Sequence, residues 1–70
     1  MMTATENELS AHDPEWERYA VLLARLQVPF VVKGLHQLLD APFCCAIKDK
    51  FNLDMTFDAK SERLHFIPRN

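Results

Sequence analysis

The chain has 70 residues, which is enough for one small domain, and 49% of them are hydrophobic. The formal net charge is −2, and residues 18–70 hold all 8 lysines and arginines with five of the acidic residues. This modest basic excess is not the dense basic stripe typical of nucleic-acid binders. Cys44 and Cys45 are adjacent and cannot close a loop, which excludes a disulfide-stapled scaffold. With no signal-peptide pattern and no apolar run of membrane-spanning length, the sequence predicts a cytoplasmic protein that does not contact membranes.

The N-terminal residues predict a tail. Residues 1–12 are polar and acidic and show no hydrophobic period. Segments of this composition bury too little apolar surface to offset the entropy of ordering. We therefore expect a disordered acidic tail over residues 1–12 and a single folded domain over residues 13–70.

Residues 14–27 are predicted to form a first helix. Asp13 and Pro14 are typical of a helix start, and Pro29 disfavours helical geometry in the residue before it. One face of this helix holds large apolar side chains that we expect in the core: Trp16, Tyr19, Leu22, Leu23 and Leu26. The opposite face is expected to hold Glu17, Arg18, Val21 and Arg25.

The middle of the chain is predicted to form two further helices. Hydrophobic spacing favours a helix over residues 31–39, although residues 30–32 also fit a short strand at a sheet edge. Gly34 is then either a helix glycine in close contact with another backbone or the join between a strand and a helix. Pro42 is typical of the first helical position, so a third helix is expected over residues 42–51.

The C-terminal residues show the clearest pattern in the chain. Apolar and polar residues alternate over residues 53–58 and again over residues 63–67, which predicts a β-hairpin with one buried face. The connection lacks glycine, so a loop over residues 58–62 is favoured over a two-residue turn. The expected fold is α+β, with three helices followed by a C-terminal β-hairpin.

This order of elements resembles the winged helix-turn-helix arrangement over residues 14–67. The resemblance is one of topology, and it implies that residues 43–51 read duplex DNA while residues 58–62 form the tip of the wing. Acidic neighbours such as Asp49 would weaken contacts with phosphates. The basic residues that the resemblance implies for DNA binding are Lys48, Lys50, Lys60 and Arg63.

Residues suited to catalysis or metal binding are sparse. Side chains adjacent on a helix point about 100° apart, so Cys44 and Cys45 do not converge with His36 or His65 as zinc ligands do. There is no glycine-rich phosphate loop, and one glycine leaves little backbone for shaping an oxyanion hole. We expect no enzyme activity, no cofactor, no metal and no small-molecule substrate.

Apolar residues left outside the expected core favour a protein partner instead. The free edge of the hairpin is also suited to accepting a strand from another chain. We expect a small non-enzymatic regulator or adaptor that binds another protein or forms a homodimer, with a DNA-binding winged-helix regulator as the alternative. The residues expected to form the protein-binding surface are Val21, Phe30, Val32 and Ile67.

Overall fold

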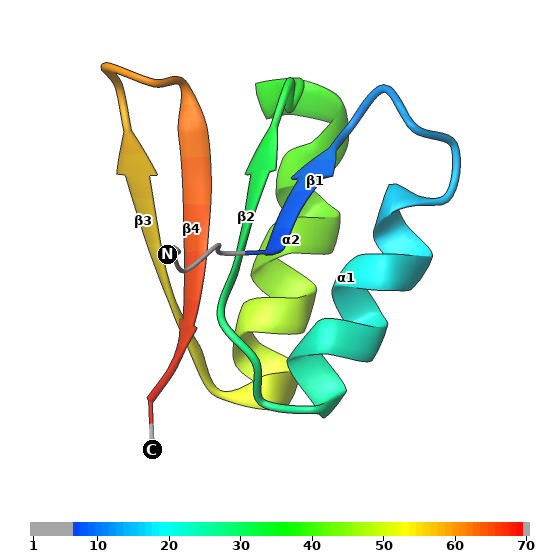
Figure 1. Cartoon of the computed structure of the whole chain (residues 1–70), viewed down its shortest axis with the longest axis vertical. Coiled ribbons are helices and arrows are strands. Elements are labelled where there is room, and N and C mark those ends of the chain that lie inside the picture. The colour runs from blue at the N-terminus through cyan, green and yellow to red at the C-terminus, as the bar shows by residue number, and fades with distance from the viewer. Residues whose placement is uncertain (1–6, 70) are drawn as a thin grey trace, which may run out of the picture.

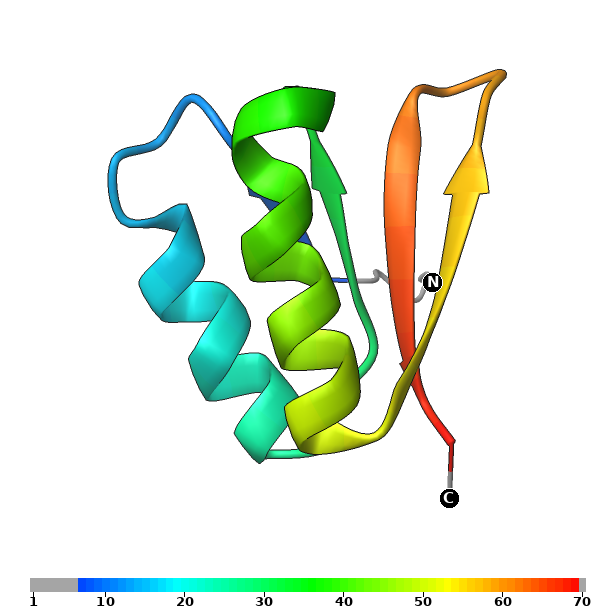
Figure 2. The ribbon, with the colours of Figure 1, turned by 180° about the vertical axis from the view of Figure 1, so that it is seen from behind.

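The computed structural model describes residues 7–69 as two helices packed on one face of a four-stranded sheet. The open face of the sheet is in front in Figure 1, and the helices are in front in Figure 2. The helices are α1 (Trp16–Arg25) and α2 (Gln37–Phe51). The strands are β1 (Asn7–Ser10), β2 (Phe30–Lys33), β3 (Leu53–Asp58) and β4 (Arg63–Pro68).

The strands lie in the order β1-β2-β4-β3. β1 and β2 are parallel and are joined through α1, since parallel neighbours need a crossover connection. β4 is antiparallel to both β2 and β3. β3 is therefore an edge strand of 6 residues, and the other edge, β1, has only 4.

The predicted three-helix, winged-helix-like fold is wrong. The first helix and the hairpin are present, but residues 30–33 form a strand in the middle of the sheet, and the second and third predicted helices are one helix, α2. Pro42 lies inside α2 and does not begin a helix. The proline removes the N–H that would bond to the carbonyl of Leu38. Since Leu38 is strongly exposed, the helix tolerates this loss at its surface.

His36 and Asp40 fix the start of α2 instead of Pro42. The Nδ1 atom of His36 accepts a hydrogen bond from the backbone N–H of Leu39 at 3.3 Å. A carboxylate oxygen of Asp40 accepts one from the backbone N–H of His36 at 2.6 Å. These two bonds occupy N–H groups that have no partner in the first turn of a helix.

Part of the predicted tail belongs to the fold. Residues 7–10 form β1, and the N–H of Ala11 donates to the carbonyl of Lys33 at 2.8 Å. Residues 1–6 lie outside the described residues. The fold therefore includes residues before residue 13.

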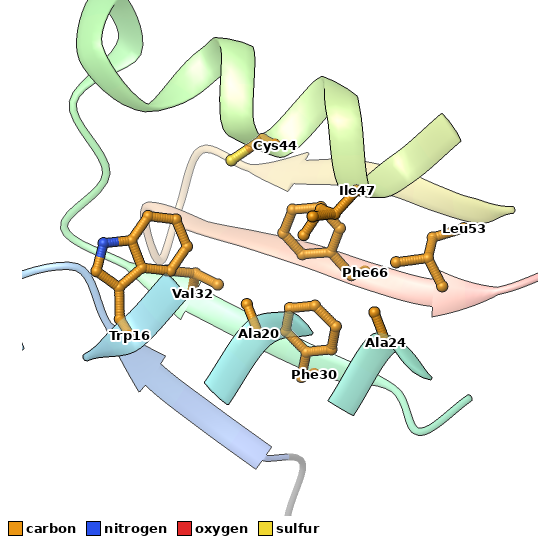
Figure 3. Packing of buried hydrophobic residues seen from close by; sticks show 9 residues of the cluster. All are labelled: Trp16, Ala20, Ala24, Phe30, Val32, Cys44, Ile47, Leu53 and Phe66. Atoms are coloured by element: carbon orange, nitrogen blue, oxygen red, sulfur yellow. The ribbon is translucent and has the colours of Figure 1, made fainter. Parts of the chain in front are cut away.

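The core lies between the helices and the sheet (Figure 3). The rings of Phe30 on β2 and Phe66 on β4 stack with their centroids 4.8 Å apart. From α1, the small side chains of Ala20 and Ala24 are fully buried over the sheet, which lets the helix lie close to it. The other buried members of this cluster are Trp16, Val32, Cys44, Ile47 and Leu53.

The predicted buried face of α1 is only partly correct. Trp16 is buried and Leu23 packs partly buried against the core, as expected. Val21, expected on the outer face, also packs partly buried against the core. Ala20 and Ala24 lie at the centre of the buried face, so the helix is rotated from the predicted orientation. Three large apolar side chains are exposed as a result: Tyr19, Leu22 and Leu26.

Gly34 joins β2 to α2, which confirms one of the two alternatives for this residue. Its backbone is left-handed, with φ of 76°. A Cβ atom at this position would lie 2.9 Å from Nε2 of His12. Glycine satisfies both the left-handed conformation and the close approach of the imidazole ring.

We expect Gly34→Ala to lower the free energy of unfolding by about 1–3 kcal/mol, because alanine is strained in the left-handed region and its methyl group meets His12. Adding His12→Ala should recover the stability that is lost through the contact with the imidazole ring. The loss that is due to the strained backbone of residue 34 should remain. Chemical denaturation of the three proteins measures both parts. A Gly34→Ala protein as stable as the native one would contradict this account.

An ion pair crosses the open face of the sheet. Arg63 at the start of β4 donates through Nε to the carboxylate of Glu8 on β1. Between them is β2, where Val31 is buried and lies in register between Glu8 and His65. The hydrogen bond from Arg63 lowers the pKa of the Glu8 carboxyl, and the charge of Lys33 adds to this effect.

Because the folded-state pKa of Glu8 is depressed, this pair contributes stability above the ordinary value of 4.5 and loses it as the pH falls through the folded-state pKa. We expect Glu8→Gln to lower the melting temperature at neutral pH. The difference between variant and native protein should shrink below pH 4.5 and disappear in stronger acid. A difference that does not change with pH would contradict a role for the charge.

Candidate partner-binding groove

A groove of about 440 Å³ lies between the first half of α2 and the β3–β4 hairpin. It exists because the hairpin extends to one side of α2, so the helix does not cover the whole of β3 (Figure 2). Burial falls along the helix-facing side of β3 for this reason. Leu53 is buried, Met55 is half-buried and Phe57 is 56% exposed.

The interior of the groove is apolar. Leu35, from the β2–α2 connection, and Leu64 on β4 are half-buried and line it together with Met55 and Phe57 of β3. An exposed phenylalanine next to such a groove leaves apolar surface in contact with water. Covering that surface would contribute about 25 cal/mol per Å².

The carboxylate residues that line the groove are Asp40 and Glu62, and its other polar lining residues are His36 and Gln37. Among the described residues, no lysine or arginine lines it. Glu62 has a left-handed backbone with φ of 57°, a conformation in which a non-glycine residue costs on the order of 1–3 kcal/mol. A glutamate thus occupies a position that favours glycine, in the lining of the groove.

The outer edge of β3 borders the same groove. β3 is hydrogen-bonded to β4 alone within the described residues, so its other side is free to pair. On the open face of the sheet, Asp54 pairs with Arg69 at 3.0 Å. Asp58 accepts hydrogen bonds from Ser61 and from the backbone N–H of Lys60, and these bonds lower the pKa of its carboxyl.

The two cysteines differ although they are adjacent. Cys44 points into the core, and burial raises the pKa of its thiol to about 11, with a smaller effect from the carboxylate of Asp40. Cys45 is exposed and lines the groove. His36 also lines the groove, whereas His65 lies on β4 with its side chain on the opposite face of the sheet, in register with Val31.

The residues predicted for a protein-binding surface do not lie together. The prediction that Phe30 and Val32 lie outside the core is wrong, because both are buried at its centre. Val21 is half-buried on α1. Ile67 is 47% exposed and lies in register with Asp54 on the open face of the sheet.

The four basic residues of the DNA alternative divide between opposite ends of the molecule (Figure 1). Lys48 and Lys50 are in the last turn of α2, whereas Lys60 and Arg63 are at the tip of the hairpin. Lys48 pairs with Asp49 at 3.1 Å, and Arg63 pairs with Glu8. The four therefore do not form the single surface that a wing and recognition helix would require.

Comparisons of the chain with protein-family models, with curated proteins and with solved structures give no significant match. Neither helix within residues 7–69 is long and apolar enough to cross a membrane. Over the same residues, no cluster of three histidine, cysteine or acidic side chains is suited to holding a metal ion.

The cysteines provide a test of this geometry. The thiolate is the reactive form, so at pH of about 8 only about one Cys44 thiol in a thousand is reactive, and burial hinders access further. We expect iodoacetamide to modify Cys45 quickly and Cys44 very slowly, as followed by mass spectrometry. The Cys45→Ser variant should show only the slow reaction. Equal rates at the two residues would contradict the burial of Cys44.

Proposed function

We propose that the protein is a small non-enzymatic binding module that takes up an extended segment of another protein along β3. The observation that supports the proposal is the free edge of β3 beside an apolar groove of about 440 Å³. An added strand obtains affinity from backbone hydrogen bonds and specificity from alternate side chains that enter adjoining pockets. β3 and the groove match these two requirements.

The geometry favours alternating side chains in the bound segment. One side of an added strand would face Met55 and Phe57, where apolar side chains would cover the exposed phenylalanine ring. The other side would lie on the open face next to Asp54, Thr56 and Asp58. A segment of alternating apolar and polar residues therefore fits this edge better than a uniformly apolar one.

The charge favours a basic segment. Asp40 and Glu62 lie at the groove without a lysine or arginine in its lining, and Asp58 lies at the end of the edge strand. Complementary charge increases the rate of association and selects among partners more than it adds to affinity. The left-handed backbone of Glu62 supports a role in binding, because glycine would be the more stable choice there.

A peptide of alternating valine and arginine tests the proposal. We expect it to bind with a dissociation constant on the order of 10–100 µM, as for weak transient complexes, and to protect Cys45 from alkylation. A peptide of the same composition, with the valines and arginines in two blocks, should bind much less. Isothermal titration calorimetry measures both affinities, and equal binding of the two peptides would contradict strand addition.

Four variants make the test specific. Phe57→Ser should weaken binding, whereas Ile67→Ser, a matched change of an exposed apolar residue on the open face, should not. Glu62→Gly should raise the free energy of unfolding by about 1 kcal/mol and yet weaken binding, because it removes both the strain and the charge. Glu62→Gln keeps the strain and should weaken binding alone. If the Glu62→Gly variant and the native protein bind the peptide with equal affinity, the proposed role of the carboxylate is contradicted.

A further inference from the structure

The hydrogen bonds between β3 and β4 determine which backbone groups of β3 face its free edge. The N–H of Arg69 donates to the carbonyl of Asn52 at 3.2 Å, and these residues are opposite each other when the register that pairs Leu53 with Pro68 is continued by one residue. In an antiparallel ladder, hydrogen-bonded pairs alternate with pairs that are not hydrogen-bonded. Pro68, which has no N–H, therefore lies in a pair that requires none.

The same alternation continues along β3. The backbone groups of Asp54, Thr56 and Asp58 are directed toward β4. Those of Met55 and Phe57 are directed toward the free edge, where no strand of the described chain pairs with them. The side chains of the same two residues line the groove. Met55 and Phe57 thus present both backbone hydrogen-bonding groups and apolar surface to a bound segment.

These outward groups favour an antiparallel segment. In antiparallel pairing, one residue of the segment exchanges both hydrogen bonds with Met55, and the residue two positions away does the same with Phe57. A parallel segment bonds through slanted hydrogen bonds, so it needs five residues to satisfy the groups that three residues satisfy in antiparallel pairing. Ordering each additional residue costs conformational entropy, which favours the antiparallel direction.

The charge differs between the two ends of the groove. α2 and β3 run in opposite directions (Figure 2), so Asp40 in the first turn of α2 lies toward the hairpin tip, where Glu62 also lines the groove. At the other end, Lys48 lies one helical turn beyond the lining residue Cys44, on the same side of α2. Lys48 pairs with Asp49, but exposed pairs of this kind are weak and leave the lysine free to contact a ligand.

The other charges near β3 do not reverse this difference. Arg69 and Asp54 pair with each other at 3.0 Å, and Lys60 is at the hairpin tip but does not line the groove. A second copy of β3 is a poor occupant of the edge, because Leu53–Asp58 contains two aspartates and no basic residue. The occupant that fits is a segment of another protein with opposite charges at its two ends.

We propose, building on strand addition at β3, that the bound segment runs antiparallel to β3, with a basic residue toward its N-terminus and an acidic residue toward its C-terminus. Its backbone bonds to Met55 and Phe57. The basic residue lies near Asp40 and Glu62, and the acidic residue lies near Lys48. Apolar residues between the two charges cover Phe57.

Two peptides with the same composition and opposite order test the direction: Arg-Thr-Val-Thr-Val-Thr-Glu and Glu-Thr-Val-Thr-Val-Thr-Arg, both with acetylated and amidated ends. In an extended segment the charged residues and valines share one face, which would lie toward the groove. We expect calorimetry to show that the first peptide binds about tenfold more tightly, because only the first places arginine at the acidic tip when antiparallel. Equal binding, or tighter binding of the second peptide, overturns the inference and leaves strand addition intact. If neither peptide binds, strand addition is overturned and the inference with it.

Two lysine variants test the charge at the start of β3. Lys48→Glu should weaken binding of the first peptide about fivefold, because it brings two carboxylates together. Lys50→Glu is the matched control, since Lys50 is exposed and lies two residues further along α2, on the opposite side of the helix. Circular dichroism confirms that both variants are folded. Equal effects of the two substitutions overturn the role of Lys48.

Amide hydrogen exchange measured by NMR tests the backbone pairing. In the free protein, the N–H groups of Met55 and Phe57 should exchange faster than those of Asp54 and Thr56, which are bonded to β4. The first peptide, at about ten times its dissociation constant, should slow exchange at Met55 and Phe57 about tenfold. A bound peptide that leaves exchange at these two residues unchanged overturns the inference.

Discussion

The stack of Phe30 on Phe66 holds the two halves of the chain together. Phe30 belongs to the β1–α1–β2 unit and Phe66 to the C-terminal hairpin, and their rings meet where β2 pairs with β4. Every other part of the fold depends on this pairing. Both helices pack over the strands that this pairing joins. β4 pairs with β2 on one side and with β3 on the other, which leaves β3 at the edge of the sheet. Removing the stack would leave two fragments that each expose an apolar face.

The sequence predicts α1 and the hairpin because each has a pattern that is local and long enough to recognise. The remaining elements depend on tertiary context. β1 and β2 have 4 residues each, and Asn7–Ser10 is stable as a strand only because β2 provides a partner. Pro42 is typical of a helix start, so the sequence predicts two helices where the structure has α2 alone. The actual start depends on hydrogen bonds of the His36 and Asp40 side chains, which hydrophobic spacing does not reveal.

Which apolar side chains are exposed depends on how the helices lie on the sheet and not on residue type. Phe57 continues the alternation of the buried strand residues, and only the position of α2 determines that it is exposed. In α1, the large apolar residues predict the buried face, but the alanines face the sheet because small side chains allow the helix to approach it. Hydrophobic periodicity shows that a helix has apolar faces, but it does not show which of two apolar faces is buried. The groove could not be inferred from the sequence either, because it depends on the position of α2 over β3.

The position of β4 has a consequence for biosynthesis. It is the last strand in the described chain and yet lies inside the sheet, between β2 and β3. While β4 is still within the ribosome, the emerged chain has no strand to place between β2 and β3, so folding is completed only after translation of residues 63–68. A premature stop codon shortly before these residues would therefore be as harmful as a much earlier one, because it removes the strand that joins β2 to β3.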